Sequence, residues 1–398
     1  MIELSAPAPI ASRDGASPTA GASPTAGAAD AAPPDGDPAG PPDPREAQTA
    51  GAAEADGGRS PGGLERPAPG LGRTTAELIG DLVRLAPHEG PVAVLKQGSG
   101  AAAWGDAAGV VVVRVGDVVL KAHPERTSEA DLRVRLDAAG RLPGLMLAPL
   151  RLERLGTRLV TLWPAGEPLT PADLEAGDDH APWEEGARLL ARLHDHPLPA
   201  GLPPDGGHAR LVRAVAALDG LDDVPPEIRG AYETLPWSHD ATGGPGEPGE
   251  LEGLGHAARP GRPMPPDGRD PAGRSTLVHG DWHLGQLVRI GGTWTLIDPD
   301  DLGVGDPAWD LARPAAWFAA GLLATSAWDR FLGAYIAAGG RAVGADDPWR
   351  ELDLPARALT VQLAATAVAT ASRAGRPLDD AARALVSSCR RILAAAPA

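Results

Sequence analysis

Two aspartates end two short apolar segments in the C-terminal half of the sequence. Asp281 ends Leu277-Val-His-Gly-Asp, and Asp298 ends Trp294-Thr-Leu-Ile-Asp. Both segments read as β-strands, with Gly291-Gly292 as the hairpin turn between them, which predicts that the two carboxylates lie side by side. Such a pair suits phosphoryl transfer, because one carboxylate orients the attacking hydroxyl and accepts its proton while the other holds Mg²⁺ on the nucleotide phosphates. Gln286 adds an amide oxygen that can ligate the metal.

Lys121 is one of two lysines in a chain whose remaining Lys/Arg positions are all arginine. It stands at the end of a β-branched run, and a predicted helix follows it. A compact ammonium at a fixed strand position suits the phosphates of a nucleotide, and a glutamate of the following helix can orient it. We therefore predict Lys121 as a phosphate ligand with Glu129 as its partner, while Glu125 and Asp131 are competing partners.

Two further segments are candidates for contact with a nucleotide. Gly98 and Gly100 follow a predicted strand at 92–95, and closely spaced glycines let backbone amides approach phosphate. An ordinary exposed turn is the alternative for this pair. Trp163 opens a short segment, 163–167, which lies in chain order where a hinge would offer backbone groups to adenine.

The residues around Asp281 admit two other interpretations. His279, Asp281 and His283 are side chains that zinc or iron favours. All three share one strand face only if the strand continues past Gly280, whereas this glycine indicates a turn. Alternatively, both histidines are hydrogen-bonding core residues and the aspartates are turn formers.

The elements that must position these residues fall into two groups. A short helix with a capping-box spacing at Thr74 and Glu77 precedes a group of strands, among them a hairpin with Gly116-Asp117 as its turn. Alanine- and leucine-rich segments with helical spacing follow. The expected strands are 92–95, 109–115, 118–122, 145–155 and 157–162, and the expected helical segments are 128–139, 182–194, 209–218, 309–339 and 354–396. This plan predicts an α+β fold of protein-kinase-like type, with a small antiparallel-sheet N-lobe and a larger helical C-lobe.

Three blocks in the C-terminal half resemble a known family. They are His279-Gly-Asp-Trp-His-Leu-Gly-Gln286, Ile297-Asp-Pro-Asp300 and Gly305-Asp-Pro-Ala-Trp-Asp-Leu-Ala312, in that order. Together they resemble the aminoglycoside phosphotransferase and choline kinase family, and the resemblance extends over roughly residues 76–390. Linked blocks in order are far more specific than any one of them alone.

The resemblance implies roles for residues and for ligands. Asp281 would be the catalytic base, Asp298 the metal-binding aspartate and Asp310 a structural anchor of the catalytic loop, with His279 and His283 supporting that loop. ATP and Mg²⁺ are the implied cofactors.

Gln286 departs from the family, whose pattern has asparagine at this position. The chain contains no asparagine at all, so composition alone can explain the change. The His-Leu-Gly-Gln sequence is also similar to that of the maltokinase and glucosamine-kinase group. Glutamine keeps the amide oxygen on one more methylene, which leaves metal ligation feasible, while a weakened second metal site is the alternative.

Composition bounds the remaining possibilities. A net charge of −17 over 398 residues argues against nucleic-acid binding, which needs clustered positive charge. One cysteine, Cys389, excludes an internal disulfide, and the absence of a signal sequence or long apolar run predicts a cytoplasmic protein without membrane contact. We expect a disordered tail at 1–74, an N-lobe at 75–162 and a C-lobe at 163–397 with a disordered insertion near 242–275.

The sequence thus predicts a small-molecule kinase. It would move the γ-phosphoryl group of ATP to a hydroxyl of an aminoglycoside, a sugar or amino sugar, or an amino alcohol. The alternative is a nucleotide-binding pseudokinase with a regulatory or scaffolding role.

Overall fold

The computed structural model describes residues 74–97, 109–170, 181–236 and 275–396. The predicted tail apart from Thr74 and the predicted insertion apart from Ser275 lie outside these ranges, as do Gly98 and Gly100. Among the described residues, no helix is both long enough and apolar enough to cross a membrane.

A five-stranded antiparallel sheet forms the N-terminal part, in the order β1-β2-β3-β5-β4. Valines dominate its inner strands, because β-branched side chains pack well on a pleated surface. Gly116, with a φ of 59°, makes the tight turn from β2 to β3, so the predicted hairpin is confirmed. The strands are β1 (Val92–Gln97), β2 (Val111–Val115), β3 (Val118–Ala122), β4 (Arg151–Leu155) and β5 (Arg158–Pro164).

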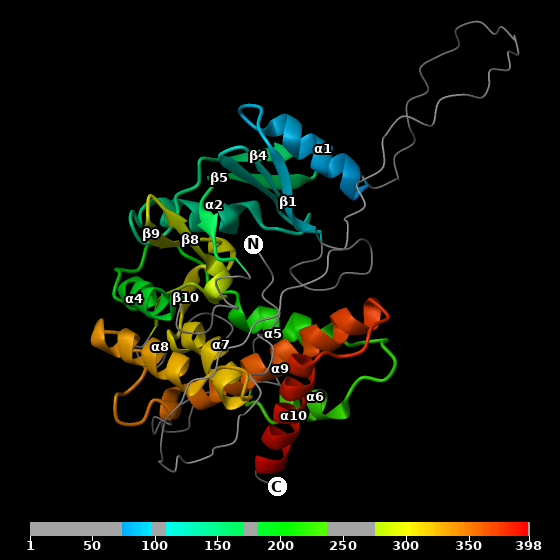
Figure 1. Ribbon diagram of the computed structural model, residues 1–398, viewed down its shortest axis with the longest axis vertical. Coiled ribbons are helices and arrows are strands. Elements are labelled where there is room, and N and C mark those ends of the chain that lie inside the picture. Colours follow the sequence, from blue (N-terminus) through cyan, green and yellow to red (C-terminus); the bar gives the residue numbers. More distant parts are fainter. Residues whose placement is uncertain (1–73, 98–108, 171–180, 237–274, 397–398) are drawn as a thin grey trace, which may run out of the picture. The chain divides into compact units, whose positions relative to one another are not determined.

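Helix α1 (Thr75–Leu85) lies against this sheet (Figure 1). It begins at the predicted capping box, in which the Thr74 hydroxyl and the Glu77 carboxylate each accept a hydrogen bond from the other's backbone N–H. Its buried Leu78 and Leu82 join the valines and leucines of β2, β3 and β5 in one core.

Helix α2 (Glu129–Gly140) packs beside the sheet through Leu132 and Leu136, which share a core with Trp163 of β5. Strand β5 ends at Pro164, two residues beyond the expected lobe boundary. Arg135 of α2 donates hydrogen bonds to the carbonyls of Leu302 and Pro204 at 2.9 and 3.2 Å. These bonds tie α2 to the segments that flank the candidate site.

The strands before the two candidate aspartates do not form one hairpin, so this part of the prediction is wrong. β7 (Thr276–Val278) pairs with β10 (Gly303–Gly305), whereas β9 (Thr293–Leu296) pairs with β8 (Leu287–Ile290), which also pairs with β6 (Glu167–Pro168). Gly291 and Gly292, both with positive φ, make the turn from β8 to β9. Because a two-residue turn joins only adjacent strand ends, it connects β9 to β8 and leaves β7 for another partner.

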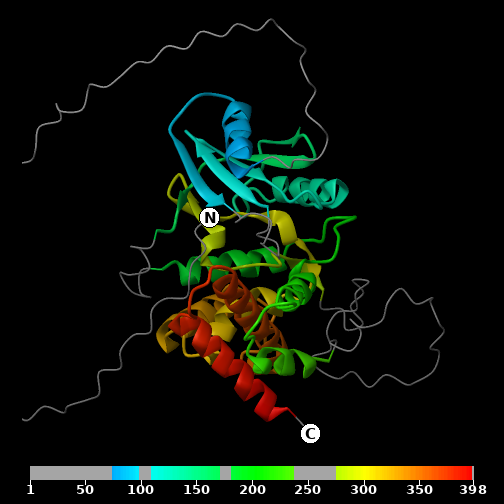
Figure 2. The same cartoon turned by 90° about the vertical axis from the view of Figure 1, so that its right-hand side faces the viewer.

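Helices make up most of the C-terminal part and surround two cores. One core contains Trp282 and Phe331, whose rings stack at 5.1 Å. The long helix α9 contacts α5, α7 and α10 (Figures 1 and 2). The helices are α4 (Trp183–His194), α5 (Gly207–Ala216), α6 (Pro226–Glu233), α7 (Ala308–Ala319), α8 (Thr325–Ala337), α9 (Trp349–Arg373) and α10 (Asp380–Ala395), with 3₁₀ turns η2 (Leu284–Gln286) and η3 (Pro299–Asp301).

Candidate active site

The loop after β7 is held by a buried carboxylate. Asp310, in the first turn of α7, accepts hydrogen bonds from the backbone N–H groups of His279 at 2.7 Å and Gly280 at 2.9 Å. Gly280 has a φ of 80°, and a Cβ there would lie 2.4 Å from the carbonyl oxygen of Asp301. Only glycine fits this close approach. The backbone of the loop therefore packs directly against the backbone of η3, and Asp281 is the next residue of the loop.

A buried hydrogen-bond chain extends behind Asp310. His194, at the end of α4, places Nε2 3.0 Å from Asp310 Oδ2 and Nδ1 2.8 Å from the Tyr335 hydroxyl of α8. The Tyr335 oxygen also accepts from the N–H of Ala342 at 3.1 Å. The consistent assignment has His194 Nε2 donating to the carboxylate and Nδ1 accepting from tyrosine. Burial raises the pKa of the Tyr335 hydroxyl, which keeps it protonated as this donor.

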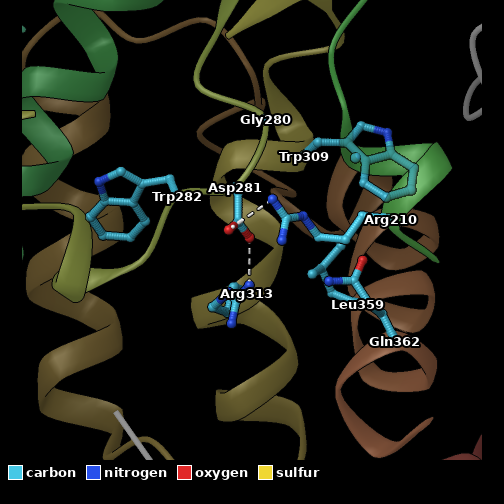
Figure 3. A pocket seen from close by; sticks show the side chains of 9 residues that line it. Arg210, Gly280, Asp281, Trp282, Trp309, Arg313, Leu359 and Gln362 are labelled. Carbon is cyan, nitrogen blue, oxygen red and sulfur yellow. Dashed lines mark hydrogen bonds and ion pairs between the residues drawn. The ribbon is translucent and has the colours of Figure 1, made fainter. Parts of the chain in front are cut away.

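Asp281 is clamped between two arginines from different helices (Figure 3). Its Oδ1 is 2.7 Å from Nη2 of Arg313 in α7, and its Oδ2 is 3.2 Å from Nη2 of Arg210 in α5. Burial alone would raise the pKa of the Asp281 carboxyl, but the two guanidiniums outweigh it and hold that pKa well below its usual range. Arg210 also pairs with Asp301 of η3, so one guanidinium bridges two carboxylates.

Lys121 contacts two aspartates that follow β9. Its Nζ is 2.5 Å from Asp298 Oδ1 and 2.7 Å from Asp300 Oδ2. Burial would lower the pKa of the Lys121 ammonium, but the two carboxylates outweigh it and raise that pKa. The pKa of Asp300 is likewise held well below its usual range, since Lys121 and His123 together exceed the effect of burial. The strand lysine and the predicted metal-binding aspartate thus meet in one cluster.

Glu129 does not take part in this cluster, which corrects the expected partnership with Lys121. Its carboxylate accepts from Arg133 one helical turn later and from Arg154 of β4. The first turn of α2 faces the edge strand β4, and the arginines there capture the glutamate. The carboxylates of η3 occupy the Lys121 ammonium instead.

Gln286 and Asp298 form the part of the site that could hold a metal. Gln286 Nε2 lies 3.5 Å from Asp298 Oδ2. Gln286 is 2% exposed, and its Oε1 has no hydrogen-bond partner among the described residues. A buried, unsatisfied oxygen is costly unless a ligand completes it. Asp298 adopts the left-handed conformation with a φ of 64°, which is rare outside glycine and marks functional positions.

A divalent cation therefore fits this pair of oxygen donors. Mg²⁺ needs one or two protein oxygens when phosphates and waters complete its shell. Among the described residues no group of three or more His, Cys, Asp and Glu side chains is arranged to hold a metal on its own. The carboxylate of Asp298 and the amide oxygen of Gln286 are two such protein oxygens, so they suit an Mg²⁺ ion whose other ligands are phosphates and waters.

The two loop histidines make local hydrogen bonds. His279 Nε2 donates to the Ile297 carbonyl at 2.8 Å, which ties β7 to the end of β9. His283 Nδ1 accepts from the N–H of Gly285 at 3.0 Å, and burial, together with the charge of Arg313, lowers the pKa of His283 to about 3. The alternative of a zinc or iron site with Asp281 gains no support, because arginines occupy the space around that carboxylate where a cation would sit.

Trp163 is a core residue in the structure. Its indole is buried, and its Nε1 donates to the Thr161 hydroxyl at 2.9 Å. The side chain packs with Leu132 and Leu136 of α2. A nucleotide contact through the backbone of this segment stays a prediction, as do the phosphate contacts of Gly98 and Gly100, which lie outside the described residues.

The sequence-based reasoning missed four charged residues of this region. Arg313 had a usable signal, because it stands three residues after Asp310 and so shares a helix face with it. Asp300 and Asp301 follow Asp298 directly and were available as candidates. Arg210 had no signal, since only tertiary packing brings α5 to the loop.

Comparisons with known proteins identify the family of the chain. A sequence model described as a phosphotransferase enzyme family matches residues 95–353, which confirms the resemblance predicted from the three blocks. No curated protein matches the sequence at a significant level.

Solved structures of kinases resemble the chain in fold. The amicoumacin kinase hAmiN, solved with AMP-PNP, Ca²⁺ and Ami, is 14% identical over 81% of this chain and 94% of its own, with a TM-score of 0.50. The choline kinase LicA from Streptococcus pneumoniae is 13% identical over 80% of this chain and 98% of its own, with a TM-score of 0.49. A choline/ethanolamine kinase family protein from Mesorhizobium loti is 16% identical over 80% and 94%, with a TM-score of 0.47. At these identities the likeness concerns the fold, and the predicted two-lobed α+β kinase-like fold is confirmed.

Proposed function

The chain belongs to the phosphotransferase enzyme family, and from this premise we propose that it transfers the γ-phosphoryl group of ATP to a hydroxyl of a small molecule in the cytoplasm. The observation that carries the proposal is the ion pair between Lys121 and Asp298 at 2.5 Å. It joins the proposed phosphate-binding lysine to the proposed metal-binding aspartate, which lie 177 residues apart in the chain.

Asp281 would orient the acceptor hydroxyl and take its proton. The carboxylate is ionised at any physiological pH, because Arg210 and Arg313 depress its pKa. A weakly basic carboxylate suits a loose phosphoryl-transfer transition state, in which the nucleophile loses its proton late and correct placement contributes most of the catalysis. The two arginines fix that placement.

Lys121 would exchange partners when the nucleotide binds. In the described structure its ammonium is held by Asp298 and Asp300, and phosphate oxygens would replace one of these carboxylates. Asp298 Oδ2 and Gln286 Oε1 would then hold Mg²⁺, which supplies charge neutralisation at the β- and γ-phosphates when bound. The burial of Gln286 Oε1 without a partner among the described residues supports this assignment.

The test is Mg²⁺-dependent ATP turnover by the full chain across a panel of sugars, amino sugars, amino alcohols and aminoglycosides. Asp281→Ala should lower kcat by about 10²–10⁴-fold, the usual contribution of a positioned base. Asp219→Ala is the matched control, because Asp219 is 71% exposed and pairs with Arg229 away from the loop. Full turnover in Asp281→Ala would refute the assigned role. Nucleotide binding without phosphorylated product for every acceptor would favour a regulatory pseudokinase instead.

A further inference from the structure

A small open pocket lies against Asp281 on its helical side (Figure 3). Its enclosed part has room for about one water molecule or one hydroxyl group, and the hollow of about 250 Å³ around that part includes open solvent. Its walls come from the start of α5, the loop at Gly280 and Asp281, and helices α7 and α9. Because Asp281 forms part of the wall, a molecule in this pocket presents its hydroxyl to the proposed base.

The charges on the pocket wall are unusual for a site that receives a cation. The charged side chains that line it in the described part of the chain are Arg210, Arg313 and Asp281. Both guanidiniums already contact the Asp281 carboxylate, so the one anionic group is neutralised. Arg210 also pairs with Asp301, so the arginines and carboxylates of this cluster balance each other. An ammonium group placed here would lose its hydration and would find both carboxylates already paired with arginine.

The uncharged groups of the pocket suit a hydroxyl-rich molecule. Gln362 reaches it from α9, is 4% exposed, and has an Oε1 without a hydrogen-bond partner among the described residues. A buried amide oxygen of this kind needs a donor, and a ligand hydroxyl supplies one. Trp309 adds a partly buried indole ring to the same wall, and its aromatic face offers apolar area to a ring-shaped ligand.

We propose that this pocket binds the acceptor, and that the acceptor is an uncharged, hydroxyl-rich compound of the sugar type rather than an aminoglycoside or an amino alcohol. The inference rests on the proposed phosphotransferase function. One hydroxyl faces Asp281, and a second donates a hydrogen bond to Gln362 Oε1. In the transfer, a bond forms between the acceptor oxygen and the γ-phosphorus, the bond from that phosphorus to the bridging oxygen of ADP breaks, and the hydroxyl proton passes to Asp281.

The experiment compares acceptors that differ by one charge. N-acetylglucosamine and glucose are neutral, whereas glucosamine is cationic below the pKa of its amine; choline and kanamycin extend the cationic set. At pH 6.5 the full chain with MgATP should show a kcat/KM for at least one neutral sugar that is about ten-fold or more above glucosamine, because the amine would lose its hydration while the carboxylates of the site are already paired with arginine. The same compounds are titrated by calorimetry in the presence of a non-hydrolysable ATP analogue.

Two variants of Gln362 test the pocket itself. Gln362→Leu should raise the KM for the neutral acceptor by about ten-fold while the KM for ATP stays unchanged, because one buried hydrogen bond to the acceptor is lost. Gln362→Glu adds one negative charge with nearly the same shape, and it should shift the ratio of neutral to cationic kcat/KM toward glucosamine. Circular dichroism and thermal unfolding of both variants establish that they fold.

The outcomes separate the inference from the proposed function. A higher kcat/KM or tighter binding for the cationic compounds would overturn the inference and leave the phosphotransferase proposal intact. An unchanged acceptor KM in a folded Gln362→Leu protein would remove the pocket as the acceptor site. If the calorimetry shows neutral sugars binding but no acceptor is phosphorylated, the binding part stands and the proposed reaction fails. If neither class binds, the inference is wrong whatever the protein's activity.

Discussion

Replacing Tyr335 with phenylalanine removes one oxygen atom from the buried chain behind the catalytic loop. That oxygen donates to His194 Nδ1 and accepts from the N–H of Ala342. Tyr335 itself is fully buried, and its ring would collide with any Cβ at Gly340. Phenylalanine keeps the ring, so the change removes hydrogen bonds without opening a cavity around the ring.

The expected loss follows from the two partners left behind. His194 is 7% exposed, and water cannot replace the hydroxyl without a rearrangement. Each buried polar group that loses its partner costs about 1–3 kcal/mol, so the free energy of unfolding should fall by about 2–6 kcal/mol. A change of this size lowers Tm by about 3–10 °C in a protein of this length. Because His194 also supports Asp310, kcat should fall as well.

The assay is urea unfolding followed by tryptophan fluorescence, with a thermal scan on the same samples. The only other tyrosine, Tyr232, provides a matched control, since it is half-buried and lies in the separate core of α5, α6, α9 and α10. Tyr232→Phe should change the free energy of unfolding by less than about 0.5 kcal/mol. Equal losses in the two variants, or no loss in Tyr335→Phe, would refute the argument that the hydroxyl completes the chain.

Three further changes test other parts of the site. Lys121→Met leaves Asp298 and Asp300 without their cation, so stability should fall by about 3–5 kcal/mol and an ATP analogue with Mg²⁺ should no longer raise Tm; unchanged protection by the analogue would contradict the role of the lysine. Burial raises the pKa of Asp205 to about 7 from 3.8, so between these pH values the folded state holds a proton that the unfolded state releases, and stability falls as pH rises through this window. Asp205→Asn should therefore stabilise the protein at pH 8, by at most about 4 kcal/mol, and have little effect at pH 4; thermal scans across pH measure the difference, and an equal effect at both pH values would contradict it. Gln286→Leu removes the proposed metal ligand and should raise the Mg²⁺ concentration for half-maximal turnover by about ten-fold or more, whereas an unchanged requirement would leave Asp298 as the sole protein ligand.

The local patterns of the sequence predicted turns and helix caps better than they predicted which strands pair. The β2–β3 hairpin and the capping box of α1 depend on residues adjacent in the chain, and both form as expected. The strand before Asp281 was expected to pair with the strand before Asp298, but it pairs with Gly303–Gly305. When two strands are not joined by a tight turn, tertiary packing decides whether they pair. A short apolar run without alternating polar residues does not reveal that packing.

The same limit applies to charged side chains. Lys121 was found because strand position and residue type together suggest phosphate binding, and it lies against Asp298. Glu129 was chosen by spacing alone, and the arginines of α2 and β4 hold it elsewhere. Arg210 entered no prediction, because its distance to Asp281 depends on how α5 packs against α9. Residue type identifies the chemistry available, whereas the fold decides which opposite charge lies nearest.

Lys121 and Asp281, the two groups proposed to act on the reactants, are each held by opposite charges of the chain itself. The ion pairs of these two groups respond differently when a ligand binds. A nucleotide brings its own negative charge, so it can replace a carboxylate at Lys121 without leaving the ammonium unpaired. A neutral acceptor brings no charge, so Arg210 and Arg313 can stay on Asp281 while the acceptor binds. Asp281 is therefore placed before the acceptor arrives, and its low basicity is acceptable because orientation rather than early proton removal limits a loose phosphoryl transfer. A cationic acceptor would have to compete with both arginines for the same carboxylate, which connects the low pKa of Asp281 and the acceptor preference to one arrangement of two arginines and two carboxylates.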